Sequence, residues 1–147
     1  MEKLSRIGMD TSKSVFQLHG VDAREQPALR KRLRRGQVVP FFSKLAPTVV
    51  AIEACGGAHY WARTLRELSH EVRLIAPQRV KPYVPRGKND AADAAAICDA
   101  VRRPAMRFVP VKEEHQQIIL CLHRTRNGFV EERTATINRL RGLLAEF

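Results

Sequence analysis

Four acidic residues of this chain occupy positions where carboxylates could bind a metal ion. Asp10 closes an apolar segment, Glu53 interrupts a second one, and Asp90 and Asp93 lie three positions apart in an alanine-rich segment. A partly buried, ionised carboxylate costs several kcal/mol unless a cation or protonation compensates it. Mg²⁺ is a hard cation that prefers carboxylate oxygens and is used on phosphates. If the four side chains converge, their residue types predict a divalent-metal site for phosphate chemistry.

The composition favours a nucleic acid as the partner of such a site. The chain has 147 residues, and its 26 Lys and Arg against 15 Asp and Glu give a net charge of +11. A positive field attracts polyanions, of which nucleic acids are the most common, although charge alone does not separate DNA from RNA or an acidic membrane. The length suits one ordinary domain with an appendage.

Cysteine usage and hydropathy point to a reducing compartment and away from a membrane. The three cysteines, Cys55, Cys98 and Cys121, are widely spaced and form no CxxC motif, which argues against a disulfide framework and against a zinc site. The first residues lack the apolar core of a signal peptide, and no segment approaches the roughly 18 apolar residues of a membrane span. We therefore expect a soluble, cytoplasmic protein.

The hydrophobic pattern predicts an α/β fold, with residues 4–10 and 14–20 as a hairpin. Residues 48–54 form a continuous β-branched run of the kind found in buried strands, and the helix that follows leads into another strand, which implies a βαβ unit. The expected strands are residues 4–10, 14–20, 26–34, 48–54 and 71–76. The expected helices are residues 38–46, 58–68, 89–103 and 113–147, the last as one or two helices with an imperfect apolar stripe.

This arrangement brings the acidic residues together. Asp10 and Glu53 lie at the C-terminal ends of two predicted strands, which is the edge where α/β sheets bind ligands. Asp90 and Asp93 share one helix face because they are three residues apart. That face continues through Ala94, Ile97 and Val101, so it is the apolar face that should pack on the sheet. The sequence thus predicts that both aspartates face the two strand ends.

Each acidic residue also has a simpler explanation. Asn89 or Asp90 could cap the helix, with Asp93 favoured in its first turn by the helix dipole. Asp10 could be an ordinary turn residue, and Glu53 could form an ion pair with one of the many arginines. Taken together, the four positions support a site more strongly than any one of them does.

Two basic stretches are candidates for phosphate binding. The first lies within residues 30–35 and the second leads directly into the segment that carries Asp90, so contact with a bound backbone is better supported there, with Lys88 as the best candidate. A solvated surface remains the alternative for both. The candidate nucleic-acid-binding residues are Arg32, Arg34, Arg35, Arg79, Lys81, Arg86 and Lys88.

Two aromatic residues follow the Gly-Gly pair at positions 56–57. Tyr60 and Trp61 could stack on bases. Trp61 also begins the apolar stripe of the predicted helix, which favours a place in the core.

Three segments resemble a known family. IGMDTSK, VAIEACGGAHYW and GKNDAADAAAI are similar to the N-terminal domain of DEDD-type insertion-sequence transposases, and the resemblance covers nearly the whole chain. It implies a RuvC-like, ribonuclease H-like catalytic domain over residues 1–110, with a mixed sheet flanked by helices. It also implies that Asp10, Glu53, Asp90 and Asp93 are the catalytic, metal-binding tetrad. Two Mg²⁺ ions roughly 4 Å apart, replaceable by Mn²⁺, would then clamp a scissile phosphodiester.

The resemblance also carries expectations about partners. Residues 111–147 would form a helical extension, able to form a coiled coil and a homo-oligomer, that leads toward a C-terminal transposase domain absent from this sequence. Members of the family act on DNA with a structured guide RNA in bacteria or archaea. We therefore expect a metal-dependent DNA transposase or recombinase domain, and the sequence leaves open whether it is active without its second domain. The alternatives are a non-catalytic DNA- or RNA-binding fragment and a stand-alone RuvC-like junction nuclease.

Overall fold

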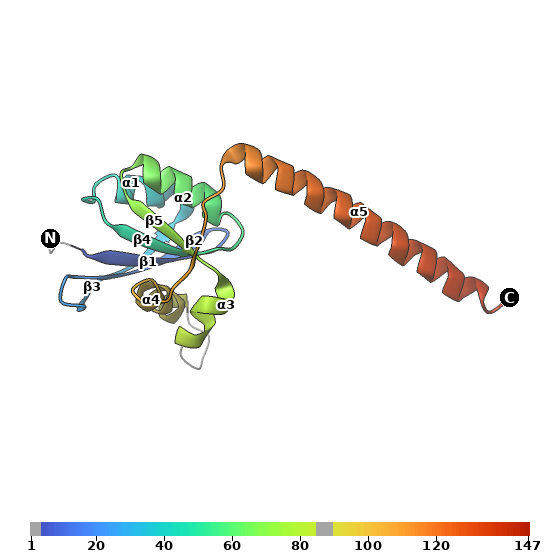
Figure 1. Cartoon of the computed structure of the whole chain (residues 1–147), viewed down its shortest axis with the longest axis horizontal. Coiled ribbons are helices and arrows are strands. Elements are labelled where there is room, and N and C mark those ends of the chain that lie inside the picture. Colours follow the sequence, from blue (N-terminus) through green and yellow to red (C-terminus); the bar gives the residue numbers. More distant parts are fainter. Residues whose placement is uncertain (1–3, 85–89) are drawn as a thin grey trace. The chain divides into compact units, whose positions relative to one another are not determined.

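The structure, a computed structural model, describes residues 4–84 and 90–147 and divides the chain into two units. The first unit is Met1–Val111 and the second is Lys112–Phe147. Figure 1 labels the elements of both units. Within α4 the backbone of Asp90 is described, but its side chain is not.

The first unit is built on a mixed β-sheet in the order β3-β2-β1-β4-β5-β6. Strands β1, β4 and β5 run parallel to one another, whereas β2, β3 and β6 each pair antiparallel with a neighbour. The strand bounds are β1 Arg6–Thr11, β2 Val15–Val21, β3 Pro27–Arg34, β4 Val49–Glu53, β5 Glu71–Ile75 and β6 Phe108–Val109. The predicted mixed sheet is confirmed, and β1 and β4 lie at its centre.

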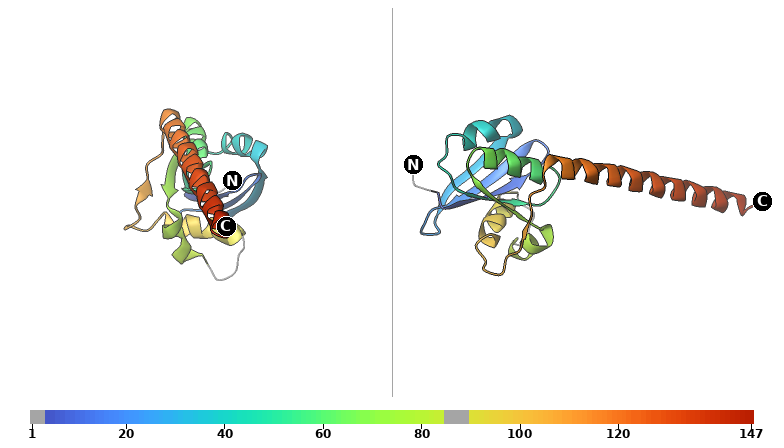
Figure 2. Two further views of the ribbon diagram at one scale, coloured as in Figure 1. Left: turned by 90° about the vertical axis from the view of Figure 1, so that its right-hand side faces the viewer. Right: turned by 45° about the horizontal axis from the view of Figure 1, so that its top comes forward.

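Helices cover both faces of this sheet. Figures 1 and 2 show α1 and α2 on one face and α3 and α4 on the other. The bounds are η1 Arg35–Gln37, α1 Val38–Phe42, α2 Ala58–Glu67, α3 Pro77–Val80, η2 Lys81–Tyr83 and α4 Asp90–Ala100. Below, these are called the α2 face and the α4 face of the sheet.

The helices differ from the predicted pattern in three places, one of which is α4, which ends at Ala100 and not at the predicted residue 103. Helix α1 ends at Phe42, earlier than the predicted residue 46. Helices α3 and η2 occupy a segment whose prolines suggested only an irregular connection. Both helices carry their proline in the first turn, where no intrahelical N–H bond is lost.

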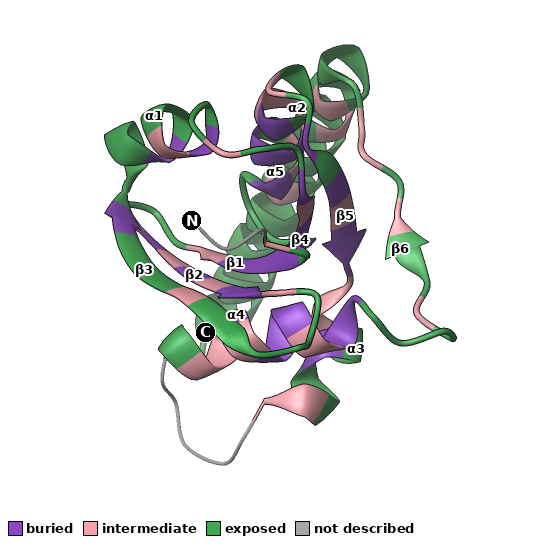
Figure 3. Cartoon of the chain, turned by 90° about the vertical axis from the view of Figure 1, so that its left-hand side faces the viewer, coloured by how far each residue is buried: buried purple, intermediate pink, exposed green. Residues whose placement is uncertain are grey.

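Two apolar clusters hold the layers together. The larger one lies between the sheet and α1 and α2, and in it the Trp61 ring meets the edge of Phe16 at a centroid distance of 5.0 Å. Trp61 is therefore a core residue, whereas Tyr60 is exposed. The smaller cluster joins the sheet to α3 and α4, mainly through Ala51, Ile75, Val80, Ile97 and Val101. Figure 3 shows the buried central strands and the largely exposed edge strand β3.

The second unit is one continuous helix, α5 (Glu114–Leu144), of 31 residues. Glu113 and Gln116 cap its first turn in a capping box, in which each side chain accepts a hydrogen bond from the backbone N–H of the other residue. Nothing within α5 is buried, and its apolar side chains, among them Leu122 and Phe129, are exposed. In the described part of the chain, no helix is both long enough and apolar enough to cross a bilayer.

Candidate active site

Asp10 and Glu53 lie side by side at the C-terminal ends of the two central strands. The parallel pairing of β1 with β4 ends at Met9 and Ile52, and each acidic residue is the next one along its strand. Asp10 pairs on its other side with Gln17 of β2. The predicted meeting of two carboxylates at the ligand-binding edge of the sheet is thus observed for this pair.

Strand alternation directs both acidic residues to the α4 face. Met9 and Ile52 belong to the core on the α2 face, and successive side chains of a strand point to opposite faces. Asp10 and Glu53 must therefore point toward α4, and both are half-buried.

Small residues beneath α4 allow the helix to approach this edge. Gly8 and Ala51 lie on the α4 face two residues before Asp10 and Glu53, respectively. A Cβ atom added to Gly8 would lie only 2.5 Å from the amide nitrogen of Cys98 and would overlap the carbonyl oxygen of Ala94. Helix α4 therefore rests directly on the backbone of β1.

The direction of α4 brings its first turn to the ends of β1 and β4 that carry Asp10 and Glu53, called the acidic edge. Its C-terminal part lies over the start of β1, where Arg6 Nε donates a 2.9 Å hydrogen bond to the carbonyl oxygen of Cys98. Ala94, one turn earlier, lies over Gly8. The helix thus runs antiparallel to β1, and the half-buried Asp93 lies on the side of Ala94 that leads toward Asp10.

The carboxylates interact electrostatically. Burial raises the pKa of the Glu53 carboxyl above its usual range, and the negative charges of Asp10 and Asp93 raise it further. The ion pairs found among the described residues do not include Glu53, so the alternative of an arginine partner gains no support there. Three of the four predicted site residues therefore share one region, and the side chain of Asp90 lies outside the described part of the chain.

The donor set suits a hard divalent cation. Carboxylate oxygens on converging elements are the ligands that Mg²⁺ prefers, and the mutual repulsion felt by Glu53 is what a cation would neutralise. Among the described side chains, no three acidic, His or Cys groups are already gathered as a closed metal cluster. Asp10, Glu53 and Asp93 are the described residues whose carboxylates could contribute to such a site.

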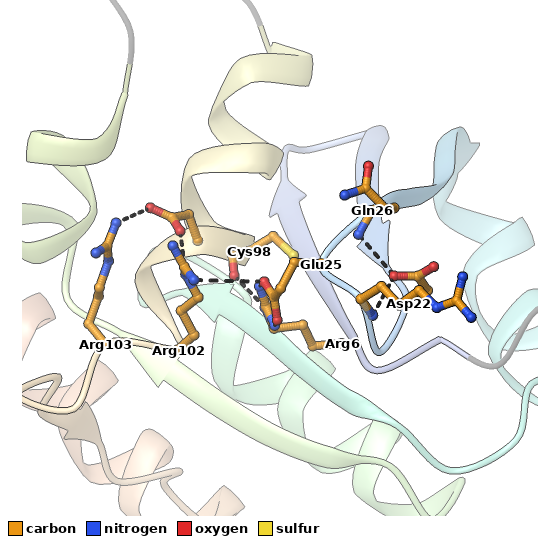
Figure 4. Close-up of polar contacts among 9 residues, drawn as sticks. Arg6, Asp22, Glu25, Gln26, Cys98, Arg102 and Arg103 are labelled. Carbon is orange, nitrogen blue, oxygen red and sulfur yellow. Dashed lines mark hydrogen bonds and ion pairs between the residues drawn. The ribbon is translucent and has the colours of Figure 1, made fainter.

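A polar network fixes the opposite end of α4. Figure 4 shows the guanidinium of Arg6 binding both carboxylate oxygens of Glu25, which lies in the turn between β2 and β3. Arg102 approaches Glu25 at 4.0 Å and also pairs with Asp99 at 2.7 Å. Sequence reasoning missed this network because Glu25 is far from Arg102 along the chain and carries no local signal.

The predicted basic residues occupy different surroundings. Arg32 and Arg34 lie on the α4 face, because Leu33 between them is buried on the α2 face. Arg79 and Lys81 are exposed on α3 and η2, which also cover the α4 face. Arg86 and Lys88 lie outside the described residues.

Arg35 differs from the other predicted basic residues. Its guanidinium lies over the rings of Trp61 and Tyr60, at 5.1 and 5.7 Å from their centroids. These rings belong to α2, so Arg35 is directed to the α2 face, where a cation–π contact holds it. Sequence alone gave no signal of this contact.

The fold and the acidic edge together define an α/β domain of the RuvC-like, ribonuclease H-like class. RuvC of T. thermophilus, solved in complex with a Holliday junction substrate, matches with a TM-score of 0.52 at 14% sequence identity. The match covers 74% of this chain and 100% of that one.

The chain belongs to the DEDD transposase family of the IS110 type, described as transposase, whose sequence profile matches residues 7–147. A Pseudomonas aeruginosa protein described as a probable family 20 transposase is 60% identical over 98% of this chain and 43% of its own length. The transposase for insertion sequence element IS1328 of Yersinia enterocolitica is 42% identical over 100% of this chain and 44% of its own. The chain spans about two fifths of the length of these relatives.

Proposed function

We propose that this domain is the metal-dependent catalytic domain of a DNA transposase and that it acts on DNA phosphodiester bonds. The observation that carries the proposal is the position of Asp10 and Glu53 side by side at the ends of the central strands, beneath the start of α4, with Asp93 near enough to raise the pKa of Glu53. Neighbouring carboxylates that raise the pKa of one of their number, in a chain of net charge +11, support a cation site at this edge.

The residues of this chain have distinct roles in the proposal. Asp10 and Glu53, fixed by the paired central strands, would form the rigid side of the site, and Asp93 and Asp90 on α4 would close it. Bound Mg²⁺, or Mn²⁺ in its place, would supply charge neutralisation at the scissile phosphate and activation of the attacking hydroxyl, with two ions as the expected number. The basic residues of the α4 face would hold the substrate backbone.

The partners extend this proposal. We infer DNA as the substrate, a structured RNA as the guide, and the cytoplasm of a bacterium or archaeon as the place of action. Self-association through α5 is part of the proposal because Leu122, Phe129 and other apolar side chains of this helix are exposed.

Calorimetric titration of Mg²⁺ and Mn²⁺ into the protein tests the metal site separately from catalysis. We expect binding in the wild type and its loss in Asp10→Asn and Glu53→Gln, with Glu67→Gln, at an exposed position of α2, as the control. Unchanged metal binding in the site variants would refute the metal site.

DNA cleavage is then assayed with duplexes, single strands and four-way junctions. Metal-dependent cleavage that both site variants lose would support catalysis. DNA binding without cleavage, unaffected by Asp10→Asn, would instead identify a binding fragment. Cleavage confined to junctions would identify a junction nuclease.

A further inference from the structure

A basic groove lies beside the acidic edge, on the same face of the sheet. It has a volume of about 410 Å³ and runs between helix α4 and the strands β2 and β3. The strands contribute polar and basic side chains, and the helix contributes alanines. Its lining residues include Gln17 and His19 of β2, Arg30 and Arg32 of β3, and Ala92 and Ala95 of α4.

The groove is positively charged. Arg30 and Arg32 are exposed, and the described ion pairs of the chain include neither of them. No carboxylate is among the described residues that line the groove. Two guanidinium groups without a carboxylate partner are well suited to bind phosphates, because each presents several N–H donors in one plane.

The wall of the groove formed by α4 leaves room for a sugar–phosphate backbone. Ala92 and Ala95 are both half-buried, and their methyl groups let a bound chain approach the helix closely. On the opposite wall, burial lowers the pKa of His19, and the positive charges of Arg30 and Arg6 lower it further. The imidazole of His19 is therefore neutral near pH 7 and can donate an N–H group to a phosphate oxygen.

The strand register places the groove in line with the acidic residues. Arg32 pairs with Gln17, and Gln17 pairs with Asp10 on the next strand. Neighbouring strands are about 4.8 Å apart, so the backbone of Arg32 lies roughly 10 Å from that of Asp10. In the neighbouring row, Arg30 pairs with His19, and His19 pairs with Gly8. A chain that follows β3 past Arg30 and Arg32 and then crosses β2 at the level of Gln17 would reach Asp10.

We propose that this groove binds the sugar–phosphate backbone of the nucleic-acid strand that enters the acidic edge, with Arg30 and Arg32 contacting successive phosphates beside α4. The direction of the strand toward the acidic edge rests on the proposed function. The binding itself does not require metal. DNA and RNA share the phosphate chemistry, and the experiments below separate them.

Affinity measurements without metal test the two arginines. We compare R30Q/R32Q with K44Q/R66Q, which removes the same charge from exposed residues after α1 and on α2. Fluorescence anisotropy with labelled DNA and RNA in EDTA should show at least about tenfold weaker binding for R30Q/R32Q and a smaller loss for K44Q/R66Q. The slope of log K against log salt should fall by about 1.4 for single strands in R30Q/R32Q alone. Equal losses in the two variants would overturn the proposal.

Cross-linking tests the location. In a C55S/C121S background, which leaves only the buried Cys98, a photoreactive probe is attached at Ala92→Cys or, as the control, at Glu67→Cys. Cross-linking from position 92 but not 67 supports the groove, and the nucleic acid captured, DNA or RNA, identifies the strand. Absent cross-linking from position 92, or cross-linking that is equal from positions 92 and 67, would overturn the proposal that the groove binds the strand. A failure of metal binding or cleavage would refute the proposed function and leave both groove results standing.

Discussion

Gly8 of the central strand lies against the carbonyl oxygen of Ala94, so helix α4 rests on bare backbone at this point. The contact sets the height of α4 above the sheet. Because Asp93 precedes Ala94, the same contact sets how closely the helix carboxylates approach Asp10 and Glu53. Glycine is required here by the space available, since any Cβ would overlap the helix backbone.

Gly8→Ala should therefore displace α4. Overpacking of a close contact typically costs about 1–3 kcal/mol, and the helix must move outward to accept the methyl group. We expect a lower free energy of unfolding, measured with urea, and weaker Mg²⁺ binding by calorimetry. Gly36→Ala is the matched control, because a Cβ there meets nothing within 4 Å. Equal stability and metal affinity in the two variants would contradict this account of the helix position.

The Arg6–Glu25 pair should make stability depend on pH. Hydrogen bonds from Arg6 hold the pKa of Glu25 below its usual range. A carboxyl with a lowered folded-state pKa stabilises the fold above its unfolded pKa of about 4.3, and that stabilisation is lost as the pH falls through the folded value. Glu25→Gln should thus lower the melting temperature at pH 7. The difference in melting temperature between this variant and the wild type should become smaller below about pH 4.

The size of this effect is limited by solvent. The side chain of Glu25 is 47% exposed, so its pair with Arg6 should contribute at most about 1 kcal/mol. Glu67→Gln, which removes an exposed carboxylate from α2, is the control. A constant difference between Glu25→Gln and the wild type from pH 7 to pH 3 would show that the ion pair is not the cause.

The sequence was sufficient to locate Asp10 and Glu53 because apolar runs show where buried strands end. The face of Asp93 followed from helical spacing alone. The position of α4 was harder to predict, since it depends on a glycine in one strand and on Glu25 in a distant turn. The surroundings of Arg35 were also beyond sequence reasoning, because its partner rings belong to a different layer of the fold.

Helix α5 should associate with itself. Leu122 and Phe129 are seven residues apart, share one helix face and are 67% and 65% exposed. L122E/F129E should therefore shift the protein toward monomer in sedimentation equilibrium and reduce its helical circular dichroism. Arg124→Glu changes the net charge equally from another helix face and should leave association unchanged. A wild-type protein that stays monomeric at tens of micromolar would exclude this role.

The acidic residues should destabilise the metal-free protein and stabilise the metal-bound protein. In EDTA, Asp10→Asn should be at least as stable as the wild type, because the charge of Asp10 disfavours the ionised form of Glu53. With Mg²⁺ at about 100 times its dissociation constant, the wild type should gain about 2.7 kcal/mol, and Asp10→Asn, Glu53→Gln and Asp93→Asn should gain much less. Thermal melts with and without metal measure both effects. Mn²⁺ should also broaden the amide NMR signals of Gly8 and Ala94 in the wild type and not in Asp10→Asn. Stabilisation by Mg²⁺ that persists in all three variants would place the metal elsewhere.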